Sequence, residues 1–358
     1  LFRSRSMGGR SLQPTDSTAV RPVHRVCCES TRNLLQYPSS GGSRNCEGRT
    51  LPCGFSVKAC AMSGVPDFNA ECLAAAEVLV ELSLAEDLRD VGDLTCQSTI
   101  PATLTAEVQL VSREQGVLSG IAILPLVFQK LPGAVQTEVH VEDGRAVQRG
   151  TVVATMRGTV RSLLIGERTV LNFATHLSGI ATRTAQFVQQ VAGTSASILD
   201  TRKTLPGYRA LQKYAVRCGG GVNHRMGLYD GVLIKDNHLA ARGEQSCAAA
   251  VAEARQWTAQ RGLPSAVEIE VDTLAQLRDA LRAYPEIVLL DNMPPDALRQ
   301  AVQIRNELSP ATLLEASGGV SLQTVRAIAE TGVERISVGS LTHSSPALDL
   351  GFDWPWKK

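Results

Sequence analysis

The amino-acid sequence predicts an α/β protein in which a small antiparallel sheet precedes an α/β barrel of about seven strands. Two observations lead to this prediction. In the first half of the chain, short segments alternate apolar and polar side chains, as half-buried strands do. From about residue 195 onward, short apolar runs that end in polar or charged residues alternate with amphipathic segments, which is the pattern of repeated βα units.

Residues 1–62 differ in composition from the rest of the chain. They are rich in Arg and Ser, contain few acidic residues and show no sustained apolar period. This composition is typical of an organelle transit peptide without stable structure, and a disordered basic tail is the alternative. Because the segment is rich in Ser as well as Arg, we expect the plastid as its destination, with the mitochondrion or the cytoplasm as alternatives.

The next part of the chain predicts helices. Apolar residues recur at helical spacing over residues 70–84, and either Asp67 or Asn69 can serve as the N-cap. A helical hairpin is expected over residues 166–191, and the pair Ser178-Gly179 is expected to break it.

Between these helices the sequence predicts the antiparallel sheet. Apolar and polar residues alternate over 106–110 and 135–141, and the turn Asp143-Gly144 leads to a third stretch at 152–154. We therefore expect an N-terminal domain over residues 63–178.

The barrel domain is expected over residues 179–340, and the final segment, 341–358, is expected to return to the N-terminal domain. Its predicted strands are residues 196–199, 221–222, 232–234, 267–271, 287–290, 313–314 and 336–338. Two helical faces lie between them: Leu211, Tyr214, Ala215 and Cys218, and then Leu274, Leu277 and Leu281. Gly219 to Gly221 are expected to stop the first of these helices.

Cationic residues follow several of the predicted strands. Arg202, Lys203, Arg225 and Lys235 all stand where a barrel gathers its reactive groups, at the C-terminal ends of strands. Arg binds carboxylate or phosphate with two parallel hydrogen bonds, and Lys adds a compact charge. Four such residues after successive strands predict a pocket for an anion with several charges, and favour a dicarboxylate over a monocarboxylate. Surface charge is the alternative for any one of them.

Carboxylates and glycines occupy the later strand ends. Glu270 and Asp291 are candidates to hold a divalent metal that bridges a pyrophosphate, or to bind sugar hydroxyls, and a structural salt bridge is the alternative. The segments Ser317-Gly318-Gly319 and Val338-Gly339-Ser340 follow the last two strands, where barrels hold phosphate through backbone N–H groups.

Several classes of protein are disfavoured. The formal net charge of +1 at pH 7 argues against a nucleic-acid partner, and no apolar run is long enough for a membrane-spanning helix, so we expect no membrane partner. The histidines do not form an HExxH motif, and no Walker P-loop, GxSxG elbow or strand-linked GxGxxG is present. His224, which lies beside Arg225, is expected to assist anion binding.

Long motifs from about residue 68 to the end of the chain resemble the quinolinate phosphoribosyltransferase family. These motifs are Glu86-Asp87, Gly92-Asp93-Leu94-Thr95, Gly166-Glu167-Arg168-Thr169, Leu177 to Thr182, Asp200-Thr201-Arg202-Lys203-Thr204, Lys213 to Gly221, Asn223 to Asp230, Leu233 to His238, Leu290-Asp291-Asn292, Glu315 to Gly319, Ser337-Val338-Gly339 and Leu341 to Ser344. The resemblance implies an N-terminal α/β sandwich domain followed by an incomplete, TIM-like α/β barrel of about seven strands. It also implies a homodimer with a shared active site, with a higher oligomer possible in principle.

The implied reaction joins quinolinate to phosphoribosyl pyrophosphate with Mg²⁺ as the cofactor, and gives nicotinate mononucleotide, pyrophosphate and CO₂. In family terms the catalytic residues are Lys203, Glu270 and Asp291. The implied quinolinate pocket consists of Thr201, Arg202, Lys203, His224, Arg225 and Lys235, with Arg168 supplied by the partner subunit. Glu270 and Asp291 serve the ribose and Mg²⁺, and Ser317, Gly318, Gly319, Val338, Gly339 and Ser340 bind the 5′-phosphate. Glu270 is preferred to Glu268 because its distance along the chain to Asp291 fits the family pattern.

Three other functions remain open at this stage. A phosphoribosyltransferase of the same fold could act without decarboxylation, and a Schiff-base aldolase could use Lys203 or Lys235. The hairpins around Asp143-Gly144 are also similar to those of lipoyl and biotinyl carriers. No Lys lies between Lys130 and Lys203, so the modified lysine of such a carrier is missing.

Overall fold

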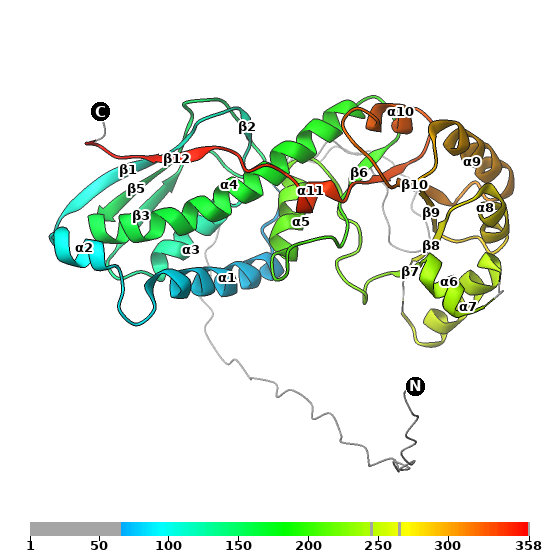
Figure 1. Cartoon of the computed structure of the whole chain (residues 1–358), viewed down its shortest axis with the longest axis horizontal. Coiled ribbons are helices and arrows are strands. Elements are labelled where there is room, and N and C mark those ends of the chain that lie inside the picture. The colour runs from blue at the N-terminus through cyan, green and yellow to red at the C-terminus, as the bar shows by residue number, and fades with distance from the viewer. Residues whose placement is uncertain (1–65, 244–245, 264–265, 357–358) are drawn as a thin grey trace, which may run out of the picture. The chain divides into compact units, whose positions relative to one another are not determined.

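A computed structural model describes residues 66–243, 246–263 and 266–356 (Figure 1). The predicted transit peptide, residues 1–62, lies outside the described residues. Within the described part of the chain, no helix is long and apolar enough to cross a membrane.

The N-terminal sheet is antiparallel, as the alternating patterns predict, and has the strand order β12-β1-β5-β3. Its last-numbered strand comes from the C-terminus of the chain, and Phe352 pairs with Leu110. A separate two-stranded sheet joins β2 and β4. The strands are β1 (Thr105–Ser112), β2 (Gly116–Val117), β3 (Val135–Val139), β4 (Ala146–Val147), β5 (Val152–Thr159) and β12 (Leu350–Asp353).

Helices pack against this sheet and against one another. Helix α4 contacts β1, β5 and β12, and α3 contacts both α4 and β3 (Figure 1). Asn69, rather than Asp67, caps α1, because its side-chain oxygen accepts a hydrogen bond from the Cys72 backbone N–H at 3.0 Å. The helical elements are α1 (Ala70–Leu88), α2 (Leu94–Thr99), the 3₁₀ turn η1 (Ile121–Ile123), α3 (Leu124–Gln129) and α4 (Val160–Gln190).

The predicted helical hairpin is wrong, because α4 is one continuous helix of 31 residues. Ser178 and Gly179 do not break it. The Ser178 hydroxyl bonds the backbone of Ser119, and a Cβ at Gly179 would collide with the backbone of Pro346 and Ala347. The glycine at 179 is therefore explained by the close approach of the C-terminal segment and not by a turn.

The second sheet contains six parallel strands in the order β6-β11-β10-β9-β8-β7. The predicted strand at 221–222 is reduced to a single bridge between Val222 and Leu199. Among the described residues no pairing joins Val222 to β7, so the barrel is incomplete at this point. The strands are β6 (Ser197–Leu199), β7 (Val232–Ile234), β8 (Val267–Val271), β9 (Ile287–Asp291), β10 (Leu313–Ser317) and β11 (Arg335–Ser337).

Helices surround this sheet, which confirms the α/β class and the incomplete barrel (Figure 1). The core between the layers is continuous: Val267, Ile269 and Val271 of β8 are fully buried and pack with the inner faces of the helices. The predicted face of α5 is buried, and α5 ends at Cys218. The helices are α5 (Arg209–Cys218), α6 (Asp236–Ala241), α7 (Cys247–Gln260), α8 (Leu274–Leu281), α9 (Pro295–Leu308), α10 (Val325–Ala329) and α11 (Ser340–His343).

Candidate active site

A cavity of about 770 Å³ opens at the C-terminal ends of the parallel strands. Residues within or just after each strand of the barrel sheet, and residues of the turn after Val222, form its wall. The lining residues are Thr201, Arg202, Lys203, His224, Arg225, Leu233, Lys235, Glu270, Leu289, Asp291, Asn292, Glu315, Ser317, Gly318, Gly319, Val320, Ser337, Val338, Gly339, Ser340 and His343. The fold thus brings together every ligand-binding residue named from the sequence except Arg168.

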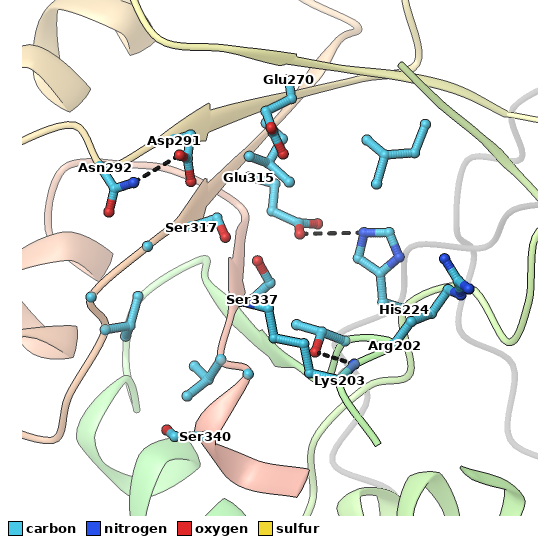
Figure 2. Close-up of a pocket in the computed structure, with 18 of the residues that line it drawn as sticks. Arg202, Lys203, His224, Glu270, Asp291, Asn292, Glu315, Ser317, Ser337 and Ser340 are labelled. Atoms are coloured by element: carbon cyan, nitrogen blue, oxygen red, sulfur yellow. Dashed lines mark hydrogen bonds and ion pairs between the residues drawn. The ribbon is translucent and has the colours of Figure 1, made fainter. Parts of the chain in front are cut away.

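One end of the cavity is cationic. In Figure 2, Arg202, Lys203 and His224 lie on the same side of the space. Burial lowers the pKa of Arg225, and the nearby charge of Arg202 lowers it further. Two guanidinium groups that repel each other in a cavity are well placed to share an anion, because an anion would relieve the repulsion.

Glu270 and Lys235 form an ion pair at the edge of the cavity. The Glu270 side chain is 11% exposed and that of Lys235 is 43% exposed, so the lysine remains accessible. Asp291, from the next strand, accepts a hydrogen bond of 2.7 Å from the side-chain amide of Asn292. Both carboxylates face the cavity, whereas Glu268 is 4% exposed and does not line it.

Glu268 lies instead beneath His224. The Nε2 atom of His224 is 3.1 Å from a Glu268 oxygen. It is also 3.4 Å from a Glu315 oxygen, as Figure 2 shows. Burial alone would lower the pKa of His224, but hydrogen bonds to the two carboxylates outweigh it and raise the pKa to about 10. The carboxylates therefore hold a proton on Nε2, and the ring is fixed at the cavity wall.

Glu315 is fully buried and is held by cations on two sides. Burial raises its pKa, but His224 and Arg335 more than compensate and bring the pKa to about 2. Arg335 donates to Glu315 at 2.7 Å. Apart from the ion pair with His224, the Glu315 Oε1 atom has no hydrogen-bond partner among the described residues, and neither has the Ser337 hydroxyl. Both residues line the cavity, although these two atoms are buried, and a polar ligand group or a water molecule that reached them would complete their hydrogen bonding.

Glycines form the part of the cavity that follows β10 and β11, and this part adjoins the cationic end where Gly339 lies beside Lys203. Gly318 has a φ of +91°, and a Cβ there would collide with the Asn292 side chain. A Cβ at Gly339 would lie 3.2 Å from the Lys203 side chain. Gly318 thus requires glycine both for backbone conformation and for close approach, whereas at Gly339, with a φ of −62°, only the close approach of Lys203 favours it.

Arg168 lies elsewhere. It is exposed on α4 and does not line the cavity of its own chain. Sequence reasoning, in turn, did not assign a site role to Glu315, Asn292, Ser337 or His343. Glu315 and Asn292 stand at strand ends beside residues that were assigned to the site, and this position in the sequence could have identified them as cavity-lining residues. Ser337 lies within β11, where the sequence pattern gives no such signal.

Two family models match this chain. The quinolinate phosphoribosyl transferase N-terminal domain matches residues 93–178, and the C-terminal domain matches residues 180–353. The chain belongs to the quinolinate phosphoribosyltransferase family. The two models meet at Gly179, inside helix α4, so the helix is shared between the two family domains.

Named relatives and solved structures agree with this family. The nicotinate-nucleotide pyrophosphorylase (carboxylating) of Mycobacterium leprae is 48% identical over 281 residues, which cover 78% of this chain and 97% of the relative. Quinolinate phosphoribosyltransferase (decarboxylating) 1b of Nicotiana tabacum is 39% identical over 287 residues, or 76% of this chain and 80% of the relative. The structure of the nicotinate-nucleotide pyrophosphorylase from Francisella tularensis superposes with a TM-score of 0.73 at 38% identity, covering 78% of this chain and 96% of that one.

Proposed function

We propose that this chain joins quinolinate to phosphoribosyl pyrophosphate and releases nicotinate mononucleotide, pyrophosphate and CO₂. The observation that supports this most directly is the division of the cavity. Four cationic side chains line one end, glycine-rich turns line the adjoining part after β10 and β11, and Glu270 and Asp291 also face the space. This arrangement suits a small dicarboxylate at the cationic end and a phosphorylated sugar in the adjoining part.

The cationic end binds quinolinate. Arg202 and Arg225 supply planar donors for the two carboxylates, and Lys203 and Lys235 add point charges. Thr201 and His224 complete the wall. Because both substrates are anions, the cavity must neutralise them before they can approach each other.

The transfer step needs mainly positioning and charge stabilisation. The ring nitrogen of quinolinate attacks C1 of the ribose, and the bond from C1 to the pyrophosphate oxygen breaks with its electron pair leaving on pyrophosphate. Positive charge develops on the ribose during this exchange, and Glu270 and Asp291 stabilise it and bind the sugar hydroxyls.

Decarboxylation follows from the product of the transfer. The carboxylate at C2 leaves as CO₂, and the electron pair left on C2 is stabilised by the adjacent pyridinium nitrogen. C2 then takes up one proton. No organic cofactor is needed for this step, because the substrate is its own electron acceptor.

The ribose 5′-phosphate occupies the glycine-rich end. The turns Ser317-Gly318-Gly319 and Val338-Gly339-Ser340 expose backbone at the ends of β10 and β11, and hydroxyl groups stand beside it. Backbone N–H groups in such turns are well suited to a phosphate dianion.

Glu270 and Asp291 also fit a Mg²⁺ ion. Mg²⁺ is usually held by one or two carboxylates together with substrate phosphates and water, and two carboxylates face the cavity here. Bound Mg²⁺ would neutralise pyrophosphate. Removal of divalent ions with a chelator should abolish turnover and added Mg²⁺ should restore it; full activity in the chelator would contradict the assignment.

The active site is shared in a homodimer, with Arg168 of each subunit reaching the quinolinate pocket of the other. Two features support this proposal. Arg168 is exposed and away from its own cavity, and α1 exposes the apolar side chains of Val78 (65%) and Leu82 (56%).

A mixing experiment tests the shared site. Arg168→Ala and Lys203→Ala should each be inactive alone, but their refolded mixture should regain about a quarter of wild-type activity, since half of the dimers carry one intact site. If the mixture stays inactive although mixed dimers form, the site is not shared.

Residues 1–62 act as a plastid transit peptide in this proposal, supported by their Arg- and Ser-rich composition. A fluorescent protein fused after residue 62 should enter plastids. Import into mitochondria, or retention in the cytoplasm, would replace this assignment with the corresponding alternative.

The reaction itself is tested by following CO₂ and nicotinate mononucleotide together from quinolinate, phosphoribosyl pyrophosphate and Mg²⁺. Equal release of both products is expected. Product from nicotinate without CO₂ would assign the chain to a non-decarboxylating transferase, and an adduct trapped by borohydride with a carbonyl substrate would indicate a Schiff-base enzyme. No product from either acid would refute the transferase assignment.

A further inference from the structure

A buried ion pair lies directly behind the cavity and is used by none of the steps above. Asp200 follows β6, Lys213 lies on α5, and their side chains are 0% and 1% exposed. Neither residue lines the cavity. The two groups are bonded to each other and to the turn that follows Val222.

The backbone of His224 is held at both its N–H and its carbonyl by this pair. Its N–H donates to Asp200 Oδ1 at 2.9 Å, and its carbonyl accepts from Lys213 Nζ at 3.0 Å. Asn223 adds a further link, since its side-chain amide donates to Asp200 at 2.5 Å and to the Lys213 carbonyl at 2.8 Å. Asp200 therefore ties its own strand end to a turn more than twenty residues away.

These contacts connect the two cationic segments of the cavity. Asp200 immediately precedes Thr201, Arg202 and Lys203, and His224 immediately precedes Arg225. No pairing of regular strands fixes the turn, because Val222 makes one isolated bridge to β6 and the barrel is open toward β7. The ion pair supplies the connection that the missing strand would otherwise give.

We infer that Asp200 and Lys213 are positioning residues that set the separation of Arg202 and Lys203 from Arg225, and that this separation selects a ligand with two adjacent carboxylates. The inference rests on the proposed function, because it names the same pocket. It adds a determinant of specificity that touches no substrate.

The energetics favour a geometric role. Burial raises the pKa of Asp200 and lowers the pKa of Lys213, since each charge has lost its hydration. A buried ion pair is often no more stabilising than apolar side chains of similar volume. Stability alone is therefore a weak reason for a charged pair at this place, whereas four directed hydrogen bonds to one turn define its position.

The test compares ligand binding in wild type and in the double variant Asp200→Asn/Lys213→Met, which removes both charges together and leaves neither one buried alone. The probes are benzene-1,2-dicarboxylate, which has the two adjacent carboxylates but no ring nitrogen and cannot react, benzoate, which has one, and phosphoribosyl pyrophosphate. Dissociation constants are measured by calorimetry, and the melting temperature is recorded in parallel.

The dicarboxylate should bind about tenfold or more weakly to the double variant, because small displacements of paired charges reduce affinity steeply. Benzoate and phosphoribosyl pyrophosphate should stay within about twofold of wild type, since neither depends on the separation of the two segments. In turnover, KM for quinolinate should rise more than KM for phosphoribosyl pyrophosphate.

Arg305→Met is the matched control. Arg305 is also buried and paired, with Glu334 at 2.8 Å, but it lies before β10 and β11 and not at the cavity. It should lower the melting temperature and leave all three dissociation constants unchanged. Asn223→Ala keeps both charges and serves as the second variant if the double variant fails to fold. It should selectively weaken binding of the dicarboxylate, by a smaller factor than the double variant.

Equally weakened binding of all three probes, or unchanged binding of the dicarboxylate in a folded variant, would overturn the inference. Because binding needs no turnover, this result is separable from the proposed function. Wild-type protein that binds the dicarboxylate but makes no nicotinate mononucleotide would refute the function and leave the positioning role testable.

Discussion

Two adjoining ends of the cavity wall, one cationic and one rich in glycine, recognise anions in different ways. At the end formed after β6, Val222 and β7, long side chains provide the charge, and buried carboxylates behind them hold the turn and the His224 ring. At the end formed after β10 and β11, glycines provide backbone, and Gly318 packs directly on Asn292. The comparison teaches that charge on side chains can be tuned to one ligand shape, whereas exposed backbone suits a group that many substrates share, such as phosphate.

The largest effect is expected at the cationic end. Arg202→Ala should lower kcat/KM for quinolinate by about 30-fold to several thousand-fold, since removing one partner of a desolvated charge pair costs about 2–5 kcal/mol. Steady-state kinetics with varied quinolinate measure this decrease in kcat/KM. Binding of phosphoribosyl pyrophosphate should change far less, and an equal loss for both substrates would show that the two ends are not separate.

A smaller effect is expected at the glycine end. Gly318→Ala forces a side chain onto a backbone with φ +91° and against Asn292, so kcat/KM for phosphoribosyl pyrophosphate should fall by about fivefold to 150-fold, the equivalent of about 1–3 kcal/mol of strain. Quinolinate analogues should bind normally.

Gly332→Ala is the control for backbone strain. Gly332 has a similar φ of +95°, but it lies outside the cavity and a Cβ there would meet Val302 at an ordinary 3.5 Å. The control should lower the melting temperature without changing either substrate's kinetics. If Gly332→Ala lowered kcat/KM for phosphoribosyl pyrophosphate as strongly as Gly318→Ala does, backbone strain and not phosphate binding would explain the effects of both variants.

The smallest effect concerns stability and pH. The folded state raises the pKa of His224 to about 10, above the usual value of 6.5. Its contribution to stability is therefore fully present below about pH 6.5 and is lost as the pH rises through about 10. The melting temperature of His224→Gln should lie below that of wild type at pH 6, and the gap should narrow toward pH 10. A gap that does not change with pH would show that packing, and not charge, accounts for the loss.

Much of the fold was predictable because it depends on local periodicity. The alternating segments gave the antiparallel strands, and the apolar runs located the strands of the barrel. Two errors share one cause. Ser178-Gly179 and Gly221-Val222 were interpreted from residue type alone, as a helix break and a strand, whereas contacts distant in sequence decided both: Pro346 and Ala347 approach Gly179, and Val222 finds only a bridge to Leu199.

The sequence by itself determined which charged residues after the strands reach the cavity, because parallel strands deliver whatever follows them to the same edge of a sheet. Arg202, Lys203, Arg225, Lys235, Glu270 and Asp291 all follow that rule. The tertiary structure alone decided their partners. That Glu268 faces His224 while Glu270 faces Lys235, although both emerge on the same side of β8, depends on their depth along the strand and on what packs around each of them. The bonds from Asp200 to Lys213 and to the His224 backbone likewise depend on what packs behind the strand end. Such pairings join residues far apart in the chain, and no local pattern encodes them.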